Sequence, residues 1–103
     1  MEEGKLECLN TLSNVIEPET GVSALQLGLL RYEIKESSMI IYYRPVSPYT
    51  PQVLVIALGV QILKSLLDFK CKDFKIILEN YYLSEEINER LEELKNELTQ
   101  IYG

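Results

Sequence analysis

The first third of the chain carries a helical pattern of apolar residues. Four of them share one face at spacings of i, i+4, i+7 and i+8: Cys8, Leu12, Val15 and Ile16. This pattern predicts a helix from about Lys5 to Glu17. The helix should end there because Pro18 disfavours helical backbone at the residue before it. Thr20 and Gly21 then predict a turn.

Three later segments have the composition and alternation of strands. Apolar and charged residues alternate from Leu29 to Lys35, and the segment from Met39 to Tyr43 is β-branched and aromatic. The polar residues between these two segments predict a β-hairpin. A third strand is predicted from Phe74 to Glu79, because its apolar residues again alternate along the chain.

Two further helices complete the pattern. One is predicted from Pro51 to about Leu67, with Thr50 as its N-cap. The run Val53–Ile56 would also suit a strand, but the length of the segment and the cap favour a helix. The other helix is predicted from about residue 84 to 102, with Ser84 as its cap. Its apolar stripe follows spacings of three and four residues: Ile87, Leu91, Leu94, Leu98 and Ile101.

The resulting order is helix, strand, strand, helix, strand, helix, which predicts a single α+β domain over residues 1–103. The small three-stranded sheet should be mixed, because the hairpin is antiparallel and a crossover helix joins parallel strands. Helices should pack on this sheet. The topology should gather at one sheet edge several scattered segments: Glu17–Glu19, Gln26, Ser47–Thr50, Tyr81 and Tyr82. Open α/β sheets bind ligands at the carboxyl ends of their strands, so this edge is the candidate site.

Composition narrows the classes of function. The chain has 103 residues, of which 47% are hydrophobic and 25% charged, as in an ordinary globular protein. Its net charge of −6 argues against nucleic acid or an anionic membrane surface as the partner. Its apolar runs are far shorter than the roughly 20 residues of a membrane helix. Because the chain contains no histidine, the usual general base is missing, and we expect no enzymatic activity.

The two cysteines, Cys8 and Cys71, are far apart in sequence and do not form a C-x-x-C motif. They could form one disulfide, but the acidic start of the chain is not typical of a secretory leader. We therefore expect reduced thiols and a cytoplasmic protein. Cys8 lies on an apolar helix face, which indicates a core residue. Cys71 stands between Lys70 and Lys72, which would favour its thiolate and make it a weak metal candidate, although such a thiol is usually incidental.

Two loop motifs carry a resemblance to a known family. Residues 15–22 read Val-Ile-Glu-Pro-Glu-Thr-Gly-Val and are followed by Leu-Gly-Leu at residues 27–29, and residues 47–51 read Ser-Pro-Tyr-Thr-Pro. These motifs resemble the V-x-D-P-E-x-G … D-L-G-L signature and the S/T-P-x-C-P loop of the SufT/PaaD-like family. Its small proteins are implicated in iron–sulfur cluster assembly and in maturation of a multicomponent oxygenase. The resemblance covers about residues 5–80 and agrees with the predicted order of elements.

The chain departs from this family at three motif positions. Glu17 and Gln26 stand where the family has aspartates, and Thr50 stands where it has its reactive cysteine. A cysteine at a helix N-terminus is stabilised as a thiolate, whereas threonine does not ionise near neutral pH and is not a soft metal ligand. The resemblance therefore implies a site that has lost thiolate chemistry. Its residues would be Glu17, Pro18, Glu19, Gln26, Gly28, Ser47, Pro48, Thr50 and Pro51.

Each of these candidates also has an ordinary structural interpretation. The Ser47–Pro51 loop is either a capped helix start or a site for an anion or a peptide carboxylate. Glu17 and Glu19 are either solvated acids of a turn or a carboxylate pair that shares a cation. The edge also holds three tyrosines, which form either a wall over the sheet or a protein-binding surface: Tyr49, Tyr81 and Tyr82.

These patterns favour a non-catalytic accessory or adaptor protein that acts through protein–protein contacts. The expected partners are the iron–sulfur assembly machinery or client apoproteins, and no bound cofactor is expected. The alternative is a direct cluster or metal carrier that uses Cys71 and Cys8 with carboxylates, across a dimer. A homo-oligomer that associates through helix surfaces is expected because residues 53–58 are apolar all round. The competing explanation is that the C-terminal helix covers this segment within one chain.

Overall fold

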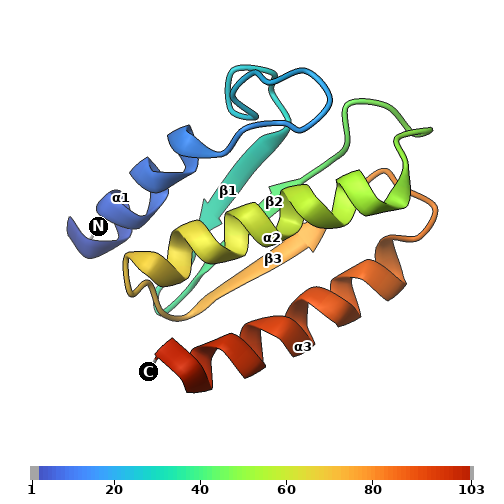
Figure 1. Ribbon diagram of the computed structural model, residues 1–103. Coiled ribbons are helices and arrows are strands. Elements are labelled where there is room, and N and C mark those ends of the chain that lie inside the picture. Colours follow the sequence, from blue (N-terminus) through green and yellow to red (C-terminus); the bar gives the residue numbers. More distant parts are fainter. Residues whose placement is uncertain (1–2, 103) are drawn as a thin grey trace.

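The structure is a computed structural model that describes residues 3–102, and it confirms the α+β class and the order of elements (Figure 1). The elements are α1 (Glu3–Asn10), the 3₁₀ helix η1 (Thr11–Asn14), β1 (Leu30–Ile34), β2 (Met39–Tyr43), α2 (Gln52–Asp68), β3 (Phe74–Leu78) and α3 (Ser84–Tyr102). None of the helices within residues 3–102 is long and apolar enough to cross a membrane.

Two helix boundaries differ from the prediction, and one agrees with it. Regular α-helix ends at Asn10, and the next residues form η1, because the hydroxyls of Thr11 and Ser13 donate to carbonyl oxygens three residues earlier. The second helix begins at Gln52, so Pro51 is its N-cap and the predicted cap Thr50 lies one position too early. The last helix covers Ser84–Tyr102 as predicted, with Ser84 as its first residue rather than its cap.

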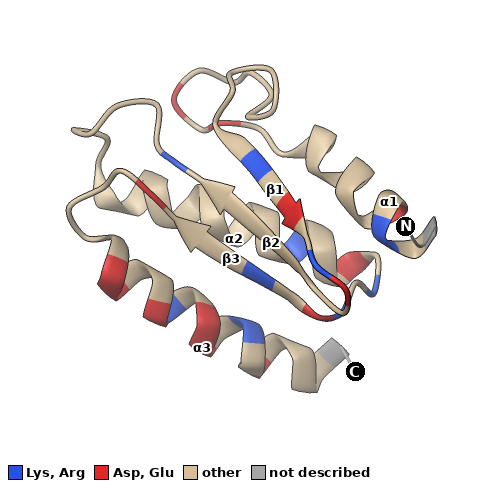
Figure 2. Cartoon of the chain, turned by 180° about the vertical axis from the view of Figure 1, so that it is seen from behind, with Lys and Arg blue, Asp and Glu red and all other residues tan. Residues whose placement is uncertain are grey.

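The sheet has the predicted mixed topology. Its strand order is β1-β2-β3, with β1 antiparallel to β2 and β2 parallel to β3. All three helices lie on one face of the sheet, with α2 between α1 and α3 (Figure 1). None of these helices crosses the opposite face (Figure 2). The starts of β1, α2 and α3 all lie at the same end of the molecule, so the candidate loops are grouped there (Figure 1).

The core lies between α2 and the sheet. Five α2 residues are almost fully buried: Val55, Leu58, Ile62, Leu63 and Leu66. On the central strand, Tyr43 is only 1% exposed, and its hydroxyl donates to the carbonyl oxygen of Val55 at 3.0 Å. This burial raises the pKa of Tyr43 well above its ordinary value. Gly59 permits the close approach, because a Cβ at that position would lie 2.5 Å from the Tyr43 hydroxyl.

Helix α3 packs against both α2 and β3 and covers the outer edge of the sheet. The side chain of Asn88 accepts from the N–H of Leu78 at 2.7 Å and donates to the Leu78 carbonyl oxygen at 3.3 Å. Lys95 donates to the carbonyl oxygen of Phe74 farther along the strand. These two side chains thus satisfy backbone groups that an uncovered edge strand would leave free.

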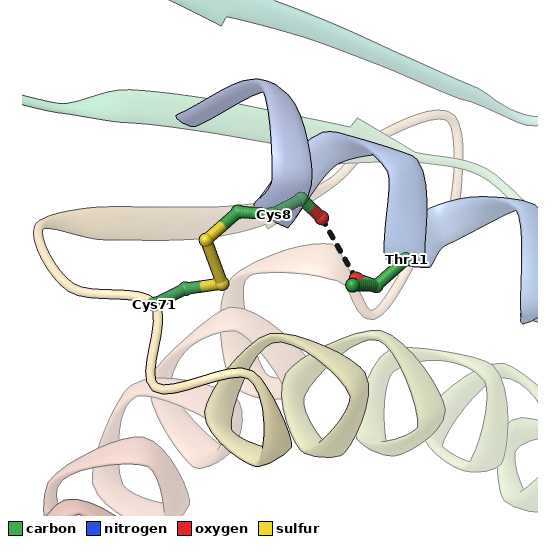
Figure 3. The surroundings of a disulfide bond; sticks show 3 residues. All are labelled: Cys8, Thr11 and Cys71. Atoms are coloured by element: carbon green, nitrogen blue, oxygen red, sulfur yellow. Dashed lines mark hydrogen bonds between the residues drawn. A yellow bond between two sulfur atoms is a disulfide. The ribbon is translucent and has the colours of Figure 1, made fainter. Parts of the chain in front are cut away.

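A disulfide joins Cys8 of α1 to Cys71 of the turn between α2 and β3 (Figure 3). Both residues are buried, with 8% and 6% of their surfaces exposed. The expectation of reduced thiols is therefore wrong, because the turn folds back under α1 and places the two Cα atoms 5.9 Å apart. The placement of Cys8 in the core is correct.

Candidate functional site

The residues predicted to share one sheet edge form two separate groups. The first is the acidic turn of residues 17–20, which is fixed to the middle of α2. Gln61 of α2 accepts from the N–H of Ile16 at 3.1 Å and donates to the carbonyl oxygen of Ile16 at 2.6 Å. The second group consists of the loop before α2 and the residues after β3. A single cavity brings these two segments together without the acidic turn.

In the acidic turn, the Glu17 carboxylate accepts hydrogen bonds from backbone N–H groups of the same turn. Its side chain is 2% exposed, and its carboxylate accepts the N–H of Glu19 at 3.1 Å and that of Thr20 at 2.8 Å. The turn closes through Gly21, which has a positive φ of 71° and donates its N–H to the carbonyl oxygen of Glu17. These contacts favour a structural role for Glu17 over a cation site shared with Glu19.

The other motif residues of this region lie at the surface. Pro18, Glu19 and Gln26 are exposed, and in the part of the chain that the structure describes Glu17 belongs to no group of three or more side chains that could hold a metal ion. Gly28 adopts a positive φ of 73°, and its carbonyl oxygen accepts from Arg44 at 3.3 Å. Gly28 therefore shapes the entry into β1.

The loop before α2 is ordered by its own hydroxyl groups. Thr50 is 5% exposed, and its Oγ1 accepts the N–H of Ser47 at 3.2 Å. The Ser47 hydroxyl in turn accepts the N–H of Tyr49 at 3.1 Å. No side chain caps α2. Thr50 thus stabilises the loop rather than the helix terminus, which corrects its predicted role as a cap.

Tyr81 joins this loop to the end of β3. It is 7% exposed, and its hydroxyl donates to the carbonyl oxygen of Thr50 at 2.7 Å. The ring of Tyr82 lies beside it, with 5.0 Å between ring centroids and an angle of 52° between ring planes. Buried Tyr81 therefore links the two loops that carry the exposed residues Tyr49 and Tyr82.

The two loops border an open cavity of about 590 Å³. We call its lining the aromatic surface, and all seven of its residues are uncharged: Pro48, Tyr49, Thr50, Pro51, Gln52, Tyr81 and Tyr82. Tyr49 is 90% exposed and Tyr82 is 80% exposed, more than any other large hydrophobic residue among those described. These rings present apolar area and hydroxyl groups to solvent without a nucleophile or a general base. Such exposed rings combine apolar contact area with a hydrogen-bonding hydroxyl, which suits a binding surface.

The disulfide also changes the metal prediction. Cys71 is not a free thiolate between Lys70 and Lys72, because its sulfur is bonded to that of Cys8. Among the described side chains of residues 4–101 there is no group of three or more Cys, Asp or Glu arranged to hold a metal ion. Neither sulfur is available as a ligand while the disulfide is intact.

Two contributors were not singled out from the sequence. Gln52 lines the aromatic surface, and Gln61 holds the acidic turn through two hydrogen bonds to Ile16. The signal for Gln61 was its position as a lone polar residue in the apolar run from 53 to 63. Gln52 had no comparable signal, because polar residues are common in the first turn of any helix.

The fold and these contacts define a small α+β protein with a three-stranded mixed sheet, helices on one face and an uncharged aromatic surface at one end. Comparisons with protein-family models, with curated proteins and with solved structures find no match to this chain.

Proposed function

We propose that this protein is a non-catalytic adaptor that binds another protein through the aromatic surface. The observation that carries this proposal is the exposure of Tyr49 and Tyr82 on a rigid base. Tyrosine is enriched at binding hot spots because a large ring contributes much contact area for little loss of side-chain entropy. The hydrogen bond from Tyr81 to Thr50 keeps the two loops in place, so little conformational entropy is lost on binding.

We propose in addition that the partner belongs to the iron–sulfur assembly machinery or is one of its client apoproteins. The support is the resemblance of residues 15–29 and 47–51 to the SufT/PaaD-like motifs. A carrier role receives less support, because both candidate sulfurs are consumed in the disulfide. A cytoplasmic location belongs to the same proposal, although structural disulfides are uncommon in that compartment outside hyperthermophiles.

Site-specific photo-crosslinking tests the proposal. A photoreactive amino acid is placed at position 49 or at position 82 in the full chain, and the crosslinked protein is identified by mass spectrometry in the native host. Position 32 is the matched control, because Tyr32 is also an exposed tyrosine, at 50%, but lies in β1 and does not line the aromatic surface. We expect one shared product from positions 49 and 82 that is not formed from position 32.

Binding assays with the purified crosslinked partner then test the binding surface and the pathway assignment separately. Tyr49→Ala and Tyr82→Ala should each weaken binding by about tenfold or more, as hot-spot truncations do, and Tyr32→Ala should not. Equal effects of all three variants would refute the aromatic surface as the binding site. A partner without any link to iron–sulfur proteins would refute the pathway assignment and leave the adaptor role intact.

A further inference from the structure

A second surface of the molecule carries an inference that goes beyond the aromatic surface. Helices α2 and α3 lie side by side on the sheet (Figure 1). A groove of about 300 Å³ lies between their side chains. Its exposed apolar floor comes from three half-buried residues, Ile56, Val60 and Leu94. Packing of α3 on α2 within one chain therefore leaves part of the apolar surface of α2 exposed.

The two walls of the groove differ in charge. The α2 wall is neutral, since no residue from 52 to 63 is charged. The α3 wall contributes Glu93 and Glu97 with a single cation, Arg90. The whole of α3 carries six glutamates against two basic residues, and Figure 2 shows these acidic residues along the helix. The groove thus combines an apolar floor with one acidic wall.

We infer that this groove binds an amphipathic helix of a partner protein that presents a basic flank to α3. A helix suits the groove because its backbone hydrogen bonds are satisfied internally. An extended segment would bury N–H and C=O groups between two helices whose own backbone groups are already paired. The apolar face of the incoming helix would cover the floor, and lysine or arginine residues on one side would face Glu93 and Glu97.

Charge also distinguishes this occupant from a second copy of the chain. A second copy of the chain would bring another molecule of net charge −6, with its own acidic α3, to the groove. Like charges at an interface that excludes water oppose association. A basic helix meets the opposite situation, because it gains attraction from the same glutamates.

The test uses two synthetic helical peptides with the same leucine face. In one peptide all the remaining positions are lysine, and in the other they are glutamate. Binding to the full-length disulfide-bonded protein is measured by fluorescence anisotropy, and helix formation in the peptide is followed by circular dichroism. We expect the leucine–lysine peptide to bind at least about tenfold more tightly than the leucine–glutamate peptide.

Charge-reversal variants locate the binding site. Glu93→Lys/Glu97→Lys should reverse the order of the two peptides. Glu85→Lys/Glu92→Lys makes the same change in net charge at α3 residues that do not line the groove, and it should keep the original order. Val60→Gln should weaken the leucine–lysine peptide by about tenfold while circular dichroism shows an intact fold.

Three outcomes would overturn the inference. Equal effects of the two charge-reversal variants would show attraction to the whole acidic molecule rather than to the groove. Failure of both peptides to bind would show that the groove takes no helix. Light scattering that finds a dimer dissociated by Val60→Gln would assign the groove to a second copy. None of these results bears on the aromatic surface, whose tyrosine variants should leave peptide binding unchanged.

Discussion

Reduction of the Cys8–Cys71 disulfide should strongly destabilise the protein. The bond closes a loop with a sequence separation of 63 residues, which constrains the unfolded chain over most of its length. The loop-entropy relation gives about 4 kcal/mol of stabilisation for a loop of this size at 25 °C. Small domains have total stabilities of about 5–15 kcal/mol, so the loss would be a large part of the whole.

Reduction should act first on the N-terminal segment. Helix α1 has only 8 residues, and isolated helices shorter than about 12–15 residues are marginal in water. Its remaining attachments include buried Leu9 and the hydrogen bonds from Lys5 to the carbonyl oxygens of Lys35 and Glu36. Those last two bonds are exposed and add little. The amides of α1 and η1 should therefore exchange with solvent faster in the reduced protein.

Urea unfolding with and without dithiothreitol measures the effect. The reduced protein should unfold at lower denaturant, with a free energy of unfolding lower by about 4 kcal/mol. Cys8→Ala/Cys71→Ala is the matched control, because its stability should be low and independent of reductant. Equal stabilities of the oxidised and reduced wild-type protein would refute the reasoning. So would alkylation of two free thiols in protein purified without reductant.

Three further predictions concern the core and the sheet edge. Asn88→Ala should lower the free energy of unfolding by about 1–3 kcal/mol, because the N–H and C=O of Leu78 lose their partner; Asn88→Asp, which keeps the acceptor, should lose less in the same urea titration. Gly59→Ala should destabilise by about 1–3 kcal/mol despite the better helix propensity of alanine, since the new Cβ would lie 2.5 Å from the Tyr43 hydroxyl, and a thermal shift in the opposite direction would contradict this packing. Because burial raises the pKa of Tyr43 in the folded state, its contribution to stability is complete below about pH 10 and is lost as the pH rises above this value. The free energy of unfolding should therefore fall less steeply at alkaline pH for Tyr43→Phe than for the wild type.

The elements were predictable because their patterns are local. The alternation in β1 and β3 and the length of the α2 segment define strands and helix without tertiary information. The mixed sheet followed from the connections between them. The end of the first helix was not predictable to the residue, because it depends on which carbonyl oxygens the hydroxyls of Thr11 and Ser13 select.

The site was predictable in composition but not in its contacts. Topology correctly brought the loop before α2 to the residues after β3. The acidic turn is held by a different contact, which the sequence does not reveal: Gln61 binds Ile16 to the middle of α2. The disulfide was missed for a similar reason. Pairing of Cys8 with a cysteine 63 positions away depends on how the turn after α2 packs under α1.

Thr50 connects these findings to the choice between an adaptor and a carrier. The family that the chain resembles has a reactive cysteine at this position, whereas this chain has a hydroxyl that accepts the N–H of Ser47. Sulfur is a weak acceptor, so a thiol at this position would hold the loop less firmly. A thiolate there would also be 95% removed from solvent, to judge from the 5% exposure of Thr50. Threonine therefore favours a loop that holds Tyr49 in a fixed position, as the proposed binding surface requires.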